Sequence, residues 1–82
     1  MIYDNLITAL DVFELIDKIR YELQFSINHL CADIIDTASY WRYLNNIRKP
    51  NLEIVLKLIW KLGLSYSDFF IRLEHHLLNN VG

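Results

Sequence analysis

The sequence predicts an all-α protein, a compact bundle of five short helices. Three observations predict this class. Apolar residues make up 54% of the 82 residues, and they recur at spacings of three and four along most of the chain. Helix breakers are scarce, with one proline and two glycines. Side chains that cap helices precede several of the apolar stripes, which indicates where separate helices begin.

Length and composition predict a single domain in the cytoplasm. Eighty-two residues suffice for one small hydrophobic core. The one cysteine, Cys31, excludes an internal disulfide. The apolar runs are too short to span a bilayer, and residues 1–4 lack the basic start of a secretory signal. We therefore expect neither membrane insertion nor secretion.

The first clear helix is predicted to begin at Asp11, after an N-terminal arm or short helix over residues 1–10. Asp11 can cap this helix, and Glu14 stands three residues further on, as a capping box requires. The stripe predicted to face inward consists of Val12, Leu15, Ile16, Ile19 and Leu23.

A second, shorter helix is predicted from Ser26, whose side chain can cap it, to about Ile34. Leu30 and Ile34 are expected to point inward because they lie four residues apart. The small Cys31 leaves room for another helix to approach closely. A tight turn is predicted at residues 35–36.

A third helix is predicted from Thr37, the expected cap, to about Asn46. Trp41 and Leu44 are expected to point inward, because they are large, apolar and three residues apart. Two short helices joined by a tight turn form a helix-turn-helix, in which the second helix has the size of the DNA major groove. The helix-turn-helix domain is predicted to cover residues 11–79.

Two further helices are predicted beyond the third. Asn51 can cap the fourth, and Gly63 is expected to end it in a left-handed conformation. Ser65 and Asp68 form another capping-box pattern for the fifth helix, which is predicted to run to about Leu78. The buried stripe of the fourth helix is predicted as Leu52, Val55, Leu56, Ile59 and Leu62, and that of the fifth as Tyr66, Phe69, Phe70, Leu73 and Leu77.

Charge is distributed unevenly along the chain. Residues 1–35 carry two cations against six acids, a net charge of −4. Residues 36–61 carry five cations against two acids, a net charge of +3, and residues 62–82 carry −1. The whole chain, at −2, does not attract nucleic acid by bulk charge. The positive part coincides with the predicted third helix and the segment after it.

Two short segments, PNLE at 50–53 and LGLS at 62–65, frame the predicted fourth helix. With them, residues 15–70 resemble the Cro/phage-repressor type of helix-turn-helix, often called the XRE family. Residues 30–44 are most similar to the Rgg-like branch of bacterial regulators. The resemblance implies a lambda-repressor-like fold. It also implies a bacterial or phage transcription factor that binds double-stranded operator DNA as a dimer, with no cofactor.

The resemblance also implies a set of DNA-contacting residues. Ser26 matches the start of the family's second helix, which touches a phosphate. The groove-facing surface of the third helix matches Ala38, Ser39, Arg42 and Tyr43. Arg42 can offer its planar guanidinium to O6 and N7 of guanine. The residues expected to read bases are Ala38, Ser39 and Arg42, and those expected to hold phosphates are Tyr40, Asn46, Arg48 and Lys49.

Several positions differ from the family's usual residues and leave a second class of function open. Ile27 stands where a polar contact residue is common. Residues 35–36 and Ile47 stand where glycine is common, and Asn45 replaces a glutamate that usually pairs with the arginine at Arg20. The alternative is a protein-interaction or dimerisation module, antirepressor-like or antitoxin-like, which keeps the fold without operator binding. A third interpretation makes the chain the leading domain of a longer regulator.

The predicted fourth helix is apolar most of the way round. Trp60 is expected on the side opposite the predicted buried stripe, and Ile54 and Leu58 add further apolar residues outside that stripe. An exposed apolar patch of this kind usually marks an interface. We expect the fifth helix to cover part of it and a second copy of the chain to cover the rest, in a homodimer.

The histidines and the cysteine do not form a catalytic or metal-binding pattern. His75 and His76 are adjacent, so they point to different sides of a helix. His29 has no ligand partner at a suitable spacing. Cys31 is expected to be a small core residue. We therefore expect no enzymatic activity, no metal and no cofactor.

Overall fold

Five α-helices account for most of residues 7–79, the part of the chain that the computed structural model describes, and this part contains no strand. The predicted all-α bundle is confirmed. The predicted arm of residues 1–10 lies mostly outside the described residues, and Ala9 and Leu10 already belong to the first helix. The helices are α1 (Ala9–Glu22), α2 (Ile27–Cys31), α3 (Thr37–Leu44), α4 (Leu52–Lys61) and α5 (Tyr66–Asn79).

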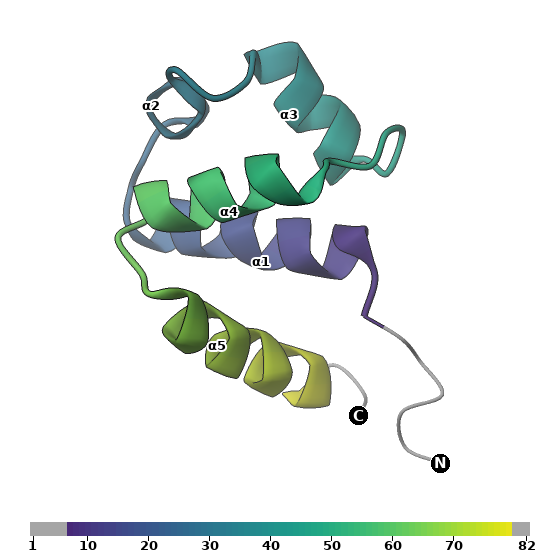
Figure 1. Cartoon of the computed structure of the whole chain (residues 1–82), viewed down its shortest axis with the longest axis vertical. Helices are drawn as coiled ribbons and strands as arrows, with labels where there is room; N and C mark the ends of the chain where they lie inside the picture. The colour runs from purple at the N-terminus through teal and green to yellow at the C-terminus, as the bar shows by residue number, and fades with distance from the viewer. Residues whose placement is uncertain (1–6, 80–82) are drawn as a thin grey trace.

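Helix α1 is the central element and packs against α3, α4 and α5. Figure 1 shows α1 and α4 side by side in the middle of the molecule, with α5 on one side and α2 and α3 on the other. An ion pair between Arg72 and Glu22, with an N···O distance of 2.8 Å, joins α5 to the end of α1. One core contains the buried residues Phe13, Leu15, Ile16, Ile19, Leu30, Cys31, Tyr40, Tyr43, Val55, Leu58, Ile59, Leu62, Phe69 and Leu73.

Helix α1 begins earlier than predicted. Its N-cap is Thr8, whose hydroxyl accepts a hydrogen bond from the Asp11 backbone N–H at 3.2 Å. The Asp11 carboxylate accepts one in return from the Thr8 backbone N–H at 2.9 Å. The assignment of Asp11 as the cap is therefore wrong, because it is the second member of a capping box one turn earlier. Phe13, missing from the predicted stripe, is fully buried, whereas Leu23 is exposed.

Helix α2 is capped by Ser26 as predicted, with the serine hydroxyl accepting a backbone N–H of the first turn at 3.0 Å. It ends at Cys31 and does not reach Ile34. Two residues later Asp33 has a φ of 65°, which a right-handed helix cannot contain. Aspartate tolerates the left-handed region better than most residues, so this turn needs no glycine. Leu30 is buried as predicted.

Helix α3 is capped by Asp36 and not by Thr37. The Asp36 carboxylate accepts a hydrogen bond from the Ser39 backbone N–H at 2.6 Å. The helix ends at Leu44, earlier than predicted. Asn46 follows with a φ of 59°, so an asparagine supplies the left-handed residue for which a glycine was expected one position later.

The buried face of α3 also differs from the prediction. Tyr40 is 0% exposed and Tyr43 is 8% exposed, whereas Trp41, predicted to point inward, is 50% exposed. Leu44 is half-buried against the core, as predicted. The Phe13 ring lies 4.9 Å from the Tyr40 ring and 5.5 Å from the Tyr43 ring, centroid to centroid. These aromatic contacts favour the observed rotation of α3 about its axis.

Helix α4 begins and ends as predicted. The Asn51 side chain caps it by accepting the Ile54 backbone N–H at 2.9 Å, and Gly63 follows its end with a φ of 81°. Its buried stripe is partly different, because Leu58 is fully buried and Leu52 is 69% exposed. The members of the predicted stripe that are buried are Val55, Ile59 and Leu62.

Helix α5 starts with the predicted contact, in which the Ser65 hydroxyl accepts the Asp68 backbone N–H at 3.1 Å. It packs on α1 and α4 through one face. Of the predicted apolar stripe, the buried members are Phe69 and Leu73, and the exposed ones are Tyr66 and Phe70.

Candidate nucleic-acid interface

The outer face of α3 is the part of the molecule that most resembles a recognition surface. Helix α3 packs on α1 and α2, and Figure 1 shows it at a corner of the bundle, on the side away from α5. Ala38, Trp41, Arg42 and Asn45 are exposed on it. Because these residues are spaced by three, four and seven, they form one continuous strip along the helix. Ser39 is half-buried at its edge.

Two of the residues predicted to contact DNA lie in the core. The Tyr40 side chain is fully buried, and its hydroxyl donates a hydrogen bond to Asp17 Oδ1 at 2.6 Å. Burial, followed by this hydrogen bond, raises the pKa of Tyr40. Tyr43 packs edge-on against Phe13 and is nearly inaccessible. The predicted phosphate contact of Tyr40 and the predicted groove-facing position of Tyr43 are therefore wrong.

A polar cluster beneath α3 explains this arrangement. The carboxylate oxygen Asp17 Oδ1 accepts hydrogen bonds from both the Tyr40 hydroxyl and Arg20 Nε, the latter at 2.8 Å. The Arg20 Nη1 donates to the Phe25 backbone carbonyl at 2.7 Å. Arg20 thus pairs with a residue of its own helix. The cluster joins α1, the start of α2 and α3, and it leaves Trp41 on the outside.

The segment after α3 presents two more cations. The Ile47 backbone N–H donates to the Arg42 carbonyl at 2.8 Å, and the Arg48 N–H donates to the same carbonyl at 3.3 Å. These bonds hold Arg48 and Lys49 next to the C-terminal end of α3, where both are exposed. Asn46, at the left-handed position, is exposed beside them.

None of the three cations of this surface is neutralised by a carboxylate at ion-pair distance within residues 7–79; they are Arg42, Arg48 and Lys49. Hydrogen bonds from Ser39 lower the pKa of Asp36, and the positive charges of Arg42 and Arg48 lower it further. The charges of both guanidinium groups therefore act on the carboxylate that caps α3. Cations without an internal partner are available to bind an anion such as phosphate.

Ser26 is exposed at the N-terminus of α2. Its oxygen accepts the His29 backbone N–H, and its hydroxyl hydrogen can still donate to a phosphate oxygen. The side chain therefore keeps the capacity that the prediction requires. Its neighbours are Arg20, Tyr21, Gln24 and Phe25, which line a shallow hollow with it.

Trp41 and Asn45 were not among the predicted DNA-contacting residues. The signal that could have found them is the spacing of Tyr40 and Tyr43. Tyr40 and Tyr43 are three residues apart, so both can lie on the buried face of α3. In that case Trp41 is on the outer face. Tryptophan is large and apolar, which predicts burial in the core. In this chain Trp41 is instead 50% exposed on the outer face of α3.

The described residues were predicted to form no metal site, and the one cysteine was predicted to lie in the core. Residues 7–79 hold no group of three or more His, Cys, Asp or Glu side chains that could bind a metal ion. Cys31 is buried, and burial raises the pKa of its thiol to about 11. The thiol is therefore protonated at neutral pH, which makes it a poor nucleophile.

Comparisons with protein-family models, with curated proteins and with solved structures found no match. Within residues 7–79, no helix has both the length and the apolar character needed to cross a membrane.

Proposed function

We propose that this protein is a sequence-specific DNA-binding regulator of the XRE type, bacterial or phage, that acts as a dimer and inserts α3 into the major groove. The observation that carries the proposal is the division of α3 into two faces. Its inner face is anchored in the core by Tyr40 and Tyr43. Its outer face presents Arg42, with Arg48 and Lys49 beside it, none of them paired with a carboxylate in the described part of the chain.

The dimensions of α3 suit this role. An α-helix with its side chains is about 10–12 Å in diameter, and the major groove is about 12 Å wide. The eight residues of α3 give two turns that can lie in it. Arg42 would donate to O6 and N7 of a guanine. Trp41 would offer apolar surface to a thymine methyl group, as apolar side chains do in this groove.

The flanking residues would hold the backbone. Arg48 and Lys49 would neutralise phosphates at the end of α3 and release counterions. Ser26 and Asn46 would donate uncharged hydrogen bonds to phosphate oxygens on either side. These contacts fix the register of α3 but do not read sequence.

The experiment that tests the proposal is a binding selection from random duplex DNA at moderate salt, using the full chain. The expected result is enrichment of an inverted repeat, because each subunit of a two-fold dimer reads one half-site. A selection that enriches no sequence, together with no duplex binding at low salt, would contradict the proposal.

A second candidate function is a protein-interaction module that keeps this fold without operator binding. The observation that favours it is the exposure of Trp41 (50%) and Ile47 (70%) on the same surface as the cations. Aromatic residues and arginine are enriched in protein interfaces. If the selection enriches no sequence and no duplex binds at low salt, the protein-interaction function becomes the favoured one. Titration of the chain with acidic peptides would then test it.

A further inference from the structure

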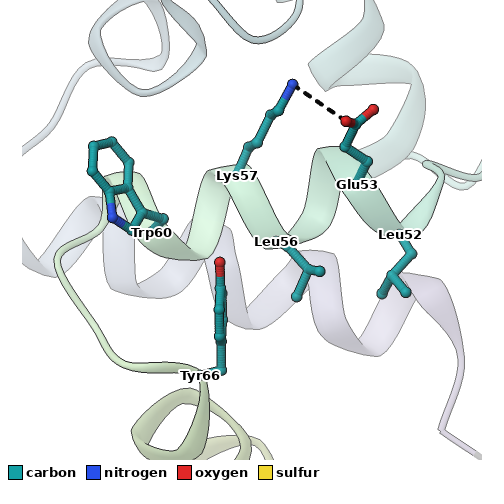
Figure 2. Close-up of a pocket in the computed structure, with 6 residues that line it drawn as sticks. All are labelled: Leu52, Glu53, Leu56, Lys57, Trp60 and Tyr66. Carbon is teal, nitrogen blue, oxygen red and sulfur yellow. Dashed lines mark ion pairs between the residues drawn. The ribbon is translucent and has the colours of Figure 1, made fainter.

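A second surface, on α4 and the start of α5, has no role in the proposed contacts of α3. It is a shallow hollow of about 380 Å³. Figure 2 shows Tyr66 rising from α5 toward Leu56, with Leu52 further along α4 on the same side as Leu56. The residues that line the hollow are Leu52, Glu53, Leu56, Lys57, Trp60 and Tyr66.

The apolar side chains of this hollow are left uncovered. Leu52 is 69% exposed, Trp60 is 71% exposed and Tyr66 is 47% exposed. Helix α5 packs on α4 and supplies Tyr66 to the hollow, but most of the Trp60 side chain stays exposed. A contiguous exposed apolar surface on a small domain marks a binding site.

The charges beside the hollow favour a particular occupant. Glu53 lies in the first turn of α4, and Lys57 lies one turn later, 3.7 Å away as an exposed ion pair. The helix is therefore acidic toward its N-terminus and basic toward its C-terminus. A second α4 running in the opposite direction would bring Glu53 next to the partner's Lys57, and Lys57 next to the partner's Glu53. A parallel copy would place Glu53 level with the partner's Glu53 and Lys57 level with the partner's Lys57, so no opposite charges would face one another.

The apolar residues are self-complementary in the same direction. Leu52, Leu56 and Trp60 are spaced by four and form one ridge along α4, so the expectation that Trp60 lies opposite the stripe with Leu52 and Leu56 is wrong. Ridges of this kind interdigitate in the commonest class of helix packing. With Leu56 at the centre, an antiparallel copy places Leu52 against the partner's Trp60. In this register Glu53 and the partner's Lys57 are offset by about 3 Å along the axis, which the long lysine side chain can span. A two-fold interface requires such matching of a surface with itself.

We propose that the occupant of this surface is a second copy of the same chain, with the two α4 helices crossing antiparallel about Leu56. A stable interface buries about 800 Å² per subunit, roughly a seventh of the 5833 Å² accessible surface. Beyond the hollow, Phe70 is 45% exposed and lies four residues after Tyr66 on the same side of α5, so it can add to the apolar surface. The inference rests on the proposed function in one respect, because it names the interface of the dimer proposed there. Self-association of the chain can be measured without DNA.

Charge reversal tests this arrangement by sedimentation equilibrium of the full chain in the absence of DNA. The wild type should dimerise. E53K alone and K57E alone should each weaken the homodimer by about tenfold or more, because each places like charges opposite one another. An equimolar mixture of E53K and K57E should form a heterodimer, and the double variant E53K/K57E should regain the homodimer.

The matched control is E14K, which makes the same charge change at an exposed site on α1 and should leave the dimer unchanged. Circular dichroism of each variant shows that it is folded. In a W41F background Trp60 is the single tryptophan, and its emission should shift to shorter wavelength as the chain dimerises.

A wild-type chain that remains monomeric would overturn the inference, as would a dimer that tolerates both single reversals. These outcomes are separate from failure of the DNA proposal. If the chain is a monomer that still selects a single half-site, only the proposed α4 interface is contradicted. If the chain is a dimer that responds to the charge reversals as predicted but binds no duplex, only the proposed DNA-binding function is contradicted.

Discussion

The Tyr40 hydroxyl donates a 2.6 Å hydrogen bond to Asp17 Oδ1, and this contact joins α3 to α1 across 23 residues of sequence. The same oxygen accepts Arg20 Nε at 2.8 Å. A buried hydroxyl requires a partner, and Asp17 supplies it at one rotation of α3 about its axis. At that rotation Trp41 and Arg42 face outward, so the contact determines which residues of α3 can reach a ligand.

Replacing Tyr40 with phenylalanine should lower the free energy of unfolding by about 1–2 kcal/mol, because Asp17 loses a buried hydrogen-bond donor. Urea denaturation measures this change. The control is Y43F, since the Tyr43 hydroxyl has no hydrogen bond within residues 7–79, and it should change stability by less than about 0.5 kcal/mol. Equal effects of the two variants would mean that the hydrogen bond to Asp17 does not hold α3.

Stability should fall at alkaline pH. Burial raises the pKa of the Cys31 thiol to about 11 from 9.0, and burial with the Asp17 hydrogen bond also raises that of Tyr40. Both groups stay protonated in the folded chain while the unfolded chain releases their protons. Their contribution is therefore complete below pH 9 and is lost as pH rises, by at most about 1.4 kcal/mol per pH unit for the thiol.

Urea denaturation from pH 7 to 11 measures this dependence. The variant C31A should show a shallower fall between pH 9 and 11, whatever its stability at neutral pH. An unchanged slope would show that the thiol does not contribute to the alkaline loss.

Gly63 should be hard to replace with alanine. Its φ of 81° is left-handed, and a Cβ added there would meet no atom within 4 Å, so the cost is backbone strain alone. We expect G63A to lower the free energy of unfolding by about 1 kcal/mol. G63N should lower it less, because asparagine tolerates this conformation. A G63A variant with wild-type stability would contradict the left-handed conformation of Gly63 after α4.

Much of the fold could be predicted from local signals, and the errors have physical causes. Ser26, Asn51 and Gly63 were predicted correctly because a cap or a left-handed stop depends on a few adjacent residues. The turn before α3 was misplaced because Asp33 adopts a left-handed φ without being glycine. The start of α1 was misplaced because Asp11 is competent both as an N-cap and as the N3 residue of a capping box whose N-cap is Thr8.

The candidate site could be predicted only in part. The exposure of Arg42, Arg48 and Lys49 follows from their charge, and the structure holds Arg48 and Lys49 next to the C-terminal end of α3, which carries Arg42. The burial of Tyr40 could not be inferred locally, because it depends on an acid 23 residues away. That long-range contact also turned Trp41 outward, which hydrophobicity alone did not predict.

Removing both loop cations, in the variant R48A/K49A, should reduce affinity for every duplex sequence to a similar extent. The slope of log affinity against log salt should fall by about 2, one phosphate contact for each cation removed. Fluorescence anisotropy over a salt series measures both quantities. The exposed lysine Lys18 on α1 provides the control, and K18A should leave affinity and slope unchanged. An unchanged slope in R48A/K49A would exclude phosphate contact by this loop.

The central claim, that the outer face of α3 reads DNA, is tested most directly by the affinity of R42A for the duplex that the selection retrieves, measured beside its urea denaturation. We predict a folded variant that binds about ten- to a hundredfold more weakly and loses its preference at one base pair of each half-site. A folded R42A with wild-type affinity and wild-type base preference would contradict the account.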